Sequence, residues 1–234
     1  MKQLIFRQLL DPESHTYSYI LGDMESKEAV LIDSVSEQTE RDLQLIDELG
    51  LKLKLILETH VHADHITGAW KLKQKTGAPI LLSKFSSVDM ADRLLDDGEN
   101  LRIGQLFITA ISTPGHTKTC MSFLWNNKVF TGDTLLIRAA GRCDFQEGSA
   151  EQLYDSITNK LFTLPETTLV YPAHDYRGFT CSSIREEKLF NQRIGGGKSK
   201  EEFVEIMNSL KLAYPEKMDV AVPANMRCGS TLSI

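Results

Sequence analysis

The sequence predicts a layered α/β domain. Three observations lead to this fold class: strand-like apolar runs recur along the chain, helical segments separate them, and no linker convincingly divides the 234 residues. A chain of this length can bury roughly 70–75% of its unfolded surface, so its core needs no covalent cross-links. We therefore expect residues 1–234 to form a single domain.

The first third of the chain alternates strands with one clear helix. Strands are predicted at 3–10, 16–23 and 28–34, followed by a helix over 36–50. Ser36 is the expected N-cap of that helix, Leu45, Ile46 and Leu49 share one face, and Gly50 occupies the position after the last turn.

The remaining elements follow the same alternation. A strand at 52–60 precedes a helix of about ten residues that starts at Thr67 and ends at Gly77. Later strands are predicted at 106–112, 120–125, 128–132 and from Leu169, with a turn at Asn126-Asn127. Ser149 and Ser199 each begin a capping-box pattern, so helices should start after them.

Composition excludes several classes of protein. The net charge is −6 with a pI near 5.6 and no run of basic residues, which argues against nucleic acid or an anionic membrane as partner. No apolar run reaches the ~18–20 residues of a membrane helix, and the first residues do not form a secretory or transit signal. Four cysteines without a C-x-x-C pair favour a reducing, cytoplasmic location.

One six-residue window carries most of the chemistry. It contains His60, His62, Asp64 and His65 and directly follows the apolar run KLILET at 54–59. On an extended backbone, His60 and His62 point the same way and can converge on one ion. Imidazole and carboxylate together suit zinc or iron. The alternative, a set of capping and core histidines, does not account for so dense a cluster.

Three further residues occupy similar positions at strand ends. His116 follows the strand at 106–112 through a Pro-Gly turn, His174 follows the strand from Leu169, and Asp133 follows the strand at 128–132. Each alone is more often a structural group, a turn former or a helix cap than a ligand. Together with the window at 60–65 they indicate one metal centre, whereas His15 is interpreted as having no role.

This ordered set resembles the five motifs of the metallo-β-lactamase superfamily. The motifs are carried by Asp33, the window His60–His65, His116, Asp133 and His174. The resemblance implies an αββα sandwich with its metal site at one edge. Superfamily members catalyse hydrolysis or redox reactions, so the fold alone does not settle the function.

Longer segments resemble the persulfide dioxygenase family, which is similar to glyoxalase II. They include THVHADHITG, FTGDTLLIRAAGRCDFQ, LVYPAHDYRGFT and the C-terminal VPANMRCG, and matches extend over most of residues 4–229. Thr134, Ala140 and Cys143 depart from the family pattern, but none is an expected ligand. The resemblance implies oxidation of glutathione persulfide by O₂ and water to sulfite and glutathione.

The family resemblance also implies one Fe(II) per chain, held by His60, His116 and Asp133. Two histidines and one carboxylate form a facial triad that leaves open positions for substrate and O₂. His62, Asp64, His65 and His174 would form a second metal site in dinuclear hydrolases. Here the resemblance makes them outer residues that orient ligands and water, although the sequence alone permits a second metal.

Several residues are candidates for the substrate pocket. Tyr176 is expected to donate a hydrogen bond near the iron, and Arg142 to support the anionic substrate. For these two, the alternatives are core packing and a surface salt bridge. Met226 and Arg227 are candidates for holding the glutathione moiety. Cys143 and Cys181 have no paired base in the sequence and are expected to be ordinary packed thiols.

Two other functions compete with this one. A glyoxalase II-type hydroxyacylglutathione hydrolase shares the histidine pattern, but only 60 residues follow His174, which is short for the helical C-terminal domain of that family. A metal-binding structural or sensor module is the other, and an open triad argues against it because structural sites are normally closed. The sequence leaves the oligomeric state open, with a homodimer as one alternative.

Overall fold

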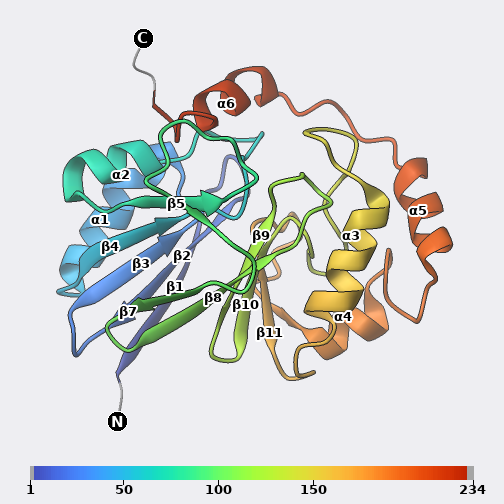
Figure 1. The fold of residues 1–234 in the computed structure, drawn as a ribbon, viewed down its shortest axis with the longest axis horizontal. Coiled ribbons are helices and arrows are strands. Elements are labelled where there is room, and N and C mark those ends of the chain that lie inside the picture. Colours follow the sequence, from blue (N-terminus) through green and yellow to red (C-terminus); the bar gives the residue numbers. More distant parts are fainter. Residues whose placement is uncertain (1–2, 231–234) are drawn as a thin grey trace.

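The computed structural model describes residues 3–230 and places two six-stranded mixed sheets face to face (Figure 1). The first sheet contains, in spatial order, β1 (Leu4–Leu10), β2 (Tyr17–Asp23), β3 (Glu28–Ile32), β4 (Lys52–Leu57), β5 (Ile80–Ser83) and β6 (Arg93–Leu95). The second contains β12 (Ser182–Ser183), β11 (Leu169–Pro172), β10 (Lys128–Gly132), β9 (Met121–Trp125), β8 (Leu106–Ser112) and β7 (Asn100–Ile103).

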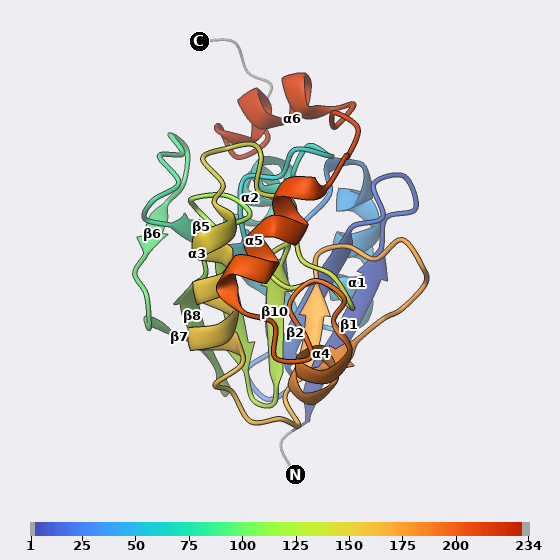
Figure 2. The same cartoon turned by 90° about the vertical axis from the view of Figure 1, so that its right-hand side faces the viewer.

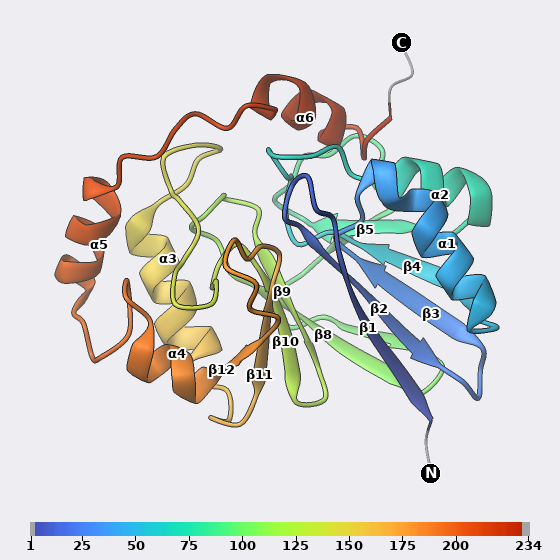
Figure 3. The ribbon, with the colours of Figure 1, turned by 180° about the vertical axis from the view of Figure 1, so that it is seen from behind.

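Helices cover the outer face of each sheet, so the predicted αββα sandwich is confirmed (Figure 3). The first sheet carries α1 (Thr39–Glu48) and α2 (Ala69–Thr76). The second carries α3 (Ala150–Ser156), its π-helical continuation at Ile157–Leu161, α4 (Ile184–Phe190) and α5 (Lys200–Ser209). The last helix, α6 (Met218–Asn225), lies across one end of the sandwich (Figure 2).

Three apolar clusters hold the layers together. Successive side chains of a strand point to opposite faces of its sheet, so one strand contributes to two clusters. Tyr19, Phe123 and Phe130 belong to the cluster between the sheets. Ile20, one residue along β2, belongs instead to the cluster beneath α1 and α2. Leu153 of α3 lies in the third cluster, on the outer face of the second sheet.

Most predicted elements are present, with differences at some ends. The Ser199 capping box is complete, and Ser149 accepts the Gln152 amide. The prediction that Ser36 caps the first helix is wrong, because Ser36 lies inside a short 3-10 turn (Ser36–Gln38) and its side chain makes no cap bond. The helix expected from Thr67 begins at Ala69, because the Thr67 side chain bonds to Glu58 and to the Ala69 amide.

Candidate metal centre

The loops that follow β4, β8, β10 and β11 bring the predicted ligands together at one end of the sandwich. His60, His116 and Asp133 form one group in which a donor atom from each residue lies within 4.8 Å of the others. Gly115 allows the loop after β8 to pass α3 closely, since a Cβ at this position would lie 2.3 Å from the Leu153 Cα. The sequence-predicted triad is thus assembled from both sheets.

Hydrogen bonds fix the tautomers of the two histidines in this group. Thr59 Oγ1 donates to Asp33 at 2.9 Å, so it accepts from His60 Nδ1 at 3.0 Å. The carbonyl oxygen of Arg142 can only accept, so His116 Nδ1 donates to it at 2.6 Å. Each ring thus uses Nδ1 for a hydrogen bond and leaves Nε2 for a metal, and Nε2 of His116 lies 3.6 Å from Asp133 Oδ2.

The electrostatics agree with a cation-binding triad. Burial, together with repulsion from His62 and His116, lowers the pKa of His60 well below its ordinary value, so the ring is neutral at pH 7. Burial would raise the pKa of Asp133, but His174 and the other nearby histidines lower it, so this carboxylate is ionised. Two neutral imidazoles and one carboxylate are the donor set that non-haem iron(II) sites use. The residues present therefore fit iron.

His174 lies behind the triad, between two carboxylates. Its Nδ1 lies 2.7 Å from Asp133 Oδ1, and its Nε2 lies 2.9 Å from Asp64 Oδ2. Burial disfavours a charged ring here, yet Asp133 and Asp64 raise the pKa of His174 well above its ordinary value. As an imidazolium it uses both nitrogens as donors, and it orients the Asp133 carboxylate.

A second group able to hold a metal consists of His62, Asp64 and His65. Thr16, which the sequence analysis missed, contacts this group: its hydroxyl lies 3.1 Å from Asp64 Oδ2 and 3.2 Å from His65 Nδ1. His62 Nε2 donates to Asp33 at 3.2 Å. Two buried nitrogens, His62 Nδ1 and His65 Nε2, have no hydrogen-bond partner among the described residues. They are therefore the atoms through which this group could bind a metal.

The triad opens into a cavity of 580 Å³. Tyr176 is 67% exposed at this cavity, and its ring stacks on that of His174 with 6.0 Å between centroids and 2° between planes. His15 also lines the cavity and meets the Tyr176 ring edge-on at 5.4 Å, and the expectation that it has no role stays a prediction. No sequence signal marked His15, because it lies in a loop without a motif.

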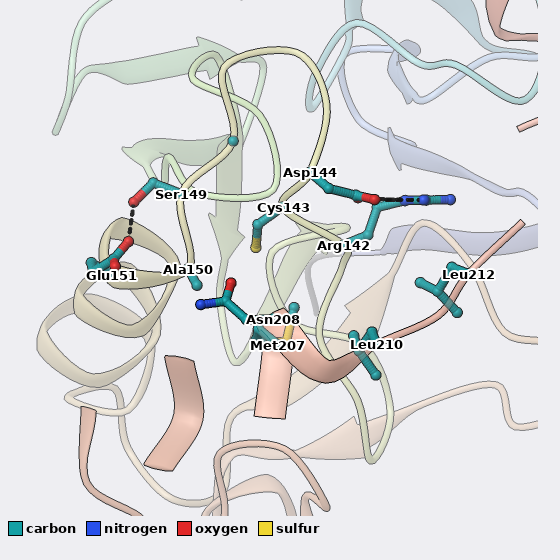
Figure 4. Close-up of a pocket in the computed structure, with 11 residues that line it drawn as sticks. Arg142, Cys143, Asp144, Ser149, Ala150, Glu151, Met207, Asn208, Leu210 and Leu212 are labelled. Carbon is teal, nitrogen blue, oxygen red and sulfur yellow. Dashed lines mark hydrogen bonds and ion pairs between the residues drawn. The ribbon is translucent and has the colours of Figure 1, made fainter. Parts of the chain in front are cut away.

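Arg142 lines the same cavity, but most of its donors are engaged. It binds both oxygens of Asp144 at 2.7 Å, and its Nη1 donates to the Ala213 carbonyl at 2.7 Å. Arg142 and Asp144 also line a second, smaller cavity of 400 Å³, together with Cys143 and Leu210 (Figure 4). Both the salt bridge and a place at the substrate cavity are therefore present, and the substrate role of Arg142 stays a prediction.

The other candidates lie further away. Met226 packs against the cluster beneath α1 and α2, and neither Met226 nor Arg227 lines the two cavities just described. Their substrate role stays a prediction without geometric support. Cys143 is partly buried, and burial raises its pKa to about 12, as expected of an unreactive thiol. The expectation that Cys181 is packed is wrong, because it is exposed in the loop before β12.

Comparison with known proteins shows to which family this chain belongs. The model of the metallo-beta-lactamase superfamily matches residues 11–174. Human "Persulfide dioxygenase ETHE1, mitochondrial" is 49% identical over 229 residues, which cover 97% of this chain and 89% of the human protein. The mouse protein of the same name is 48% identical over 229 residues, which again cover 97% of this chain and 89% of the relative. The chain belongs to the persulfide dioxygenase family.

A solved structure of the same family agrees over the whole fold. The crystal structure of ETHE1 from Myxococcus xanthus has a TM-score of 0.94 and 52% identity, and the match covers 97% of this chain and 100% of that one. A metallo-beta-lactamase from Staphylococcus aureus, 24% identical with a TM-score of 0.90, shares the fold. The family assignment of this chain therefore rests on full-length similarity to persulfide dioxygenases, and its αββα architecture is that of the superfamily.

Proposed function

We propose that this protein is an iron-dependent persulfide dioxygenase that oxidises glutathione persulfide with O₂ and water to sulfite and glutathione. The single observation that carries the proposal is the triad of His60, His116 and Asp133, in which both rings have Nδ1 engaged in a hydrogen bond and all three residues line one cavity. The names of the relatives supply the substrate class.

In this proposal His60, His116 and Asp133 hold one Fe(II) per chain. When bound, iron supplies the open coordination positions at which a soft sulfur anion and O₂ can meet. Asp133 contributes the charge that compensates the cation. Both ring nitrogens of His174 bond to carboxylates, those of Asp133 and Asp64. His174 is therefore not free to bind a second metal in this arrangement, which favours one metal over two.

The remaining polar residues have separate tasks. Tyr176 lines the cavity, and its phenol, whose ordinary pKa is about 10, keeps the proton it would donate towards the substrate or O₂. Arg193 also lines the cavity and brings positive charge, which suits a substrate with carboxylates, whereas the Lys217 ammonium group is paired with Glu13. Arg142, held by Asp144, would act mainly by shaping the wall and adding positive potential.

Location and organisation are part of the same proposal. None of the helices in residues 3–230 is long and apolar enough to cross a membrane. The four cysteines are free thiols, which fits a reducing compartment, and we place the protein in the cytoplasm although the mammalian relatives are named mitochondrial. Residues 1–234 act in this proposal as one catalytic domain.

Oxygen consumption tests the function. Iron-loaded protein should take up O₂ on addition of glutathione persulfide and release sulfite, and metal analysis should give about one Fe per chain. Asp133→Asn and His116→Ala should lose both iron and O₂ uptake, whereas the exposed Asp47→Asn on α1 should keep both. Hydrolysis of S-D-lactoylglutathione without O₂ uptake, by protein that holds two zinc ions, would instead establish the glyoxalase II alternative.

A further inference from the structure

The C-terminal helix α6 brings one buried polar side chain to the metal-binding loop. Asn225 is only 3% exposed, whereas Val220 on the same helix is 66% exposed. The helix lies above the end of the sandwich where the metal loops gather (Figure 2). A buried amide with no hydrogen bonds would be costly, so its partners indicate why it is there.

Three hydrogen bonds join the Asn225 side chain to the loop at 60–67. Its Nδ2 donates to the carbonyl oxygens of His62 and His65, both at 2.8 Å. Its Oδ1 accepts the backbone N–H of Thr67 at 2.9 Å. The amide thereby uses both donors and one acceptor on a single loop, across a sequence separation of about 160 residues.

Through Thr67 and Glu58, Asn225 is also connected to the ring of His62. Thr67 Oγ1 donates to Glu58 Oε1 at 2.6 Å, and Glu58 Oε2 lies 3.5 Å from His62 Nε2. Asn225 fixes the Thr67 backbone from the other side, so the loop is held both at its carbonyl groups and through this carboxylate.

The residues after Asn225 fit closely against the same loop. The Cys228 carbonyl accepts the Trp70 amide at 2.9 Å, which fixes the start of α2. A Cβ at Gly229 would lie 2.2 Å from the Thr67 carbonyl oxygen, so only glycine allows this approach. The C-terminal motif therefore packs on the metal-binding loop and not on the substrate cavity.

We propose that Asn225 is a positioning residue of the metal centre. It contacts neither a triad side chain nor the cavity, but it bonds the backbone of His62, His65 and Thr67, in the loop that begins at the triad residue His60. The inference rests on the proposed function only in assigning iron to the triad. Side chains that orient ligands from outside the coordination sphere commonly affect metal affinity by 10–100-fold.

Iron affinity of the full chain, measured by competition with a chelator, tests the proposal. Asn225→Ala removes all three bonds, and Asn225→Asp keeps only the acceptor for Thr67 while placing oxygen against two carbonyl groups. Both variants should bind Fe(II) about 10–100-fold more weakly. Val220→Ala, on the exposed face of the same helix, should match the wild type.

Two further readouts separate positioning from general stability. The electron paramagnetic resonance spectrum of the ferrous nitric oxide adduct should change in both Asn225 variants, because the ligand geometry changes. Hydrogen exchange should accelerate in residues 60–67 and stay unchanged in the β2 and β9 strands. A variant in which only the melting temperature of the iron-free protein falls would show a merely structural role and overturn the proposal.

The outcome does not depend on the dioxygenase reaction. If Asn225→Ala does not fold, Asn225→Asp, which is nearly isosteric, carries the same test. A folded Asn225 variant with wild-type iron affinity and spectrum would overturn the proposal, even if the enzyme oxidises persulfide. Conversely, weakened iron binding would support it even if glutathione persulfide is not the substrate.

Discussion

Gly141 gives a sharp test of how the triad is positioned, because it contacts two of the three proposed ligands. A Cβ built at Gly141 would lie 2.3 Å from the Asp133 carbonyl oxygen and 2.9 Å from the His116 ring. An ordinary carbon–oxygen contact is about 3.3–3.6 Å, so the overlap in Gly141→Ala is roughly 1 Å. The backbone oxygen cannot rotate away as a flexible side chain could.

The cost follows from that overlap. The Gly141 amide donates to the same Asp133 oxygen at 2.8 Å, and His116 donates to the carbonyl of the next residue, Arg142, at 2.6 Å. Overpacking of this kind lowers the free energy of unfolding by about 1–3 kcal/mol. A displacement of about 1 Å at a reacting centre can lower the rate by ~100-fold.

Two measurements on Gly141→Ala check this reasoning: denaturant unfolding of the iron-free protein, and kcat/KM from O₂ uptake at full iron loading. Gly98→Ala is the matched control, because Gly98 has φ +77° and no atom within 4 Å of the added Cβ. Its strained backbone should cost about 1–2 kcal/mol of stability with no loss of rate. Wild-type kcat/KM in Gly141→Ala would refute the view that this contact positions His116 and Asp133.

Three other predictions concern single side chains. Tyr176→Phe should lower kcat by roughly 10-fold or more, because a positioned donor matters most in the transition state; unchanged kcat with full iron content would leave Tyr176 a packing residue. Arg142→Gln should raise KM with a smaller effect on kcat, and an O₂ electrode titration with persulfide separates the two constants. In the iron-free protein, burial opposes the charge on His62, but Asp33 raises its pKa to about 10. The folded pKa is above the unfolded value of ~6.5, so this stabilisation is complete below that pH and is lost as the pH rises to about 10. Denaturation midpoints should fall over this range, and less steeply in Asp33→Asn; equal slopes in the two proteins would contradict the assignment.

The sequence by itself determined which residues are candidate ligands and which fold presents them. His60, His116, Asp133 and His174 each follow a strand within a few residues, and strand ends are visible as alternation, glycine and proline in the sequence. These signals are local, because side-chain period and capping depend on residues only a few positions apart. Motif order then sufficed for the superfamily resemblance, and the longer matching segments for the family resemblance, both of which the comparisons confirm.

Only the tertiary structure decided how these residues work together. The orientation of the His116 ring depends on the Arg142 carbonyl, and the charge of His174 depends on Asp133 and on Asp64, which is 110 residues away in sequence. His15 lies at the cavity and Asn225 contacts the loop at 60–67, and no local sequence pattern predicts either contact. Such contacts are set when two sheets pack and distant loops meet, and hydrophobic periodicity encodes which face is buried but not which loop lies opposite.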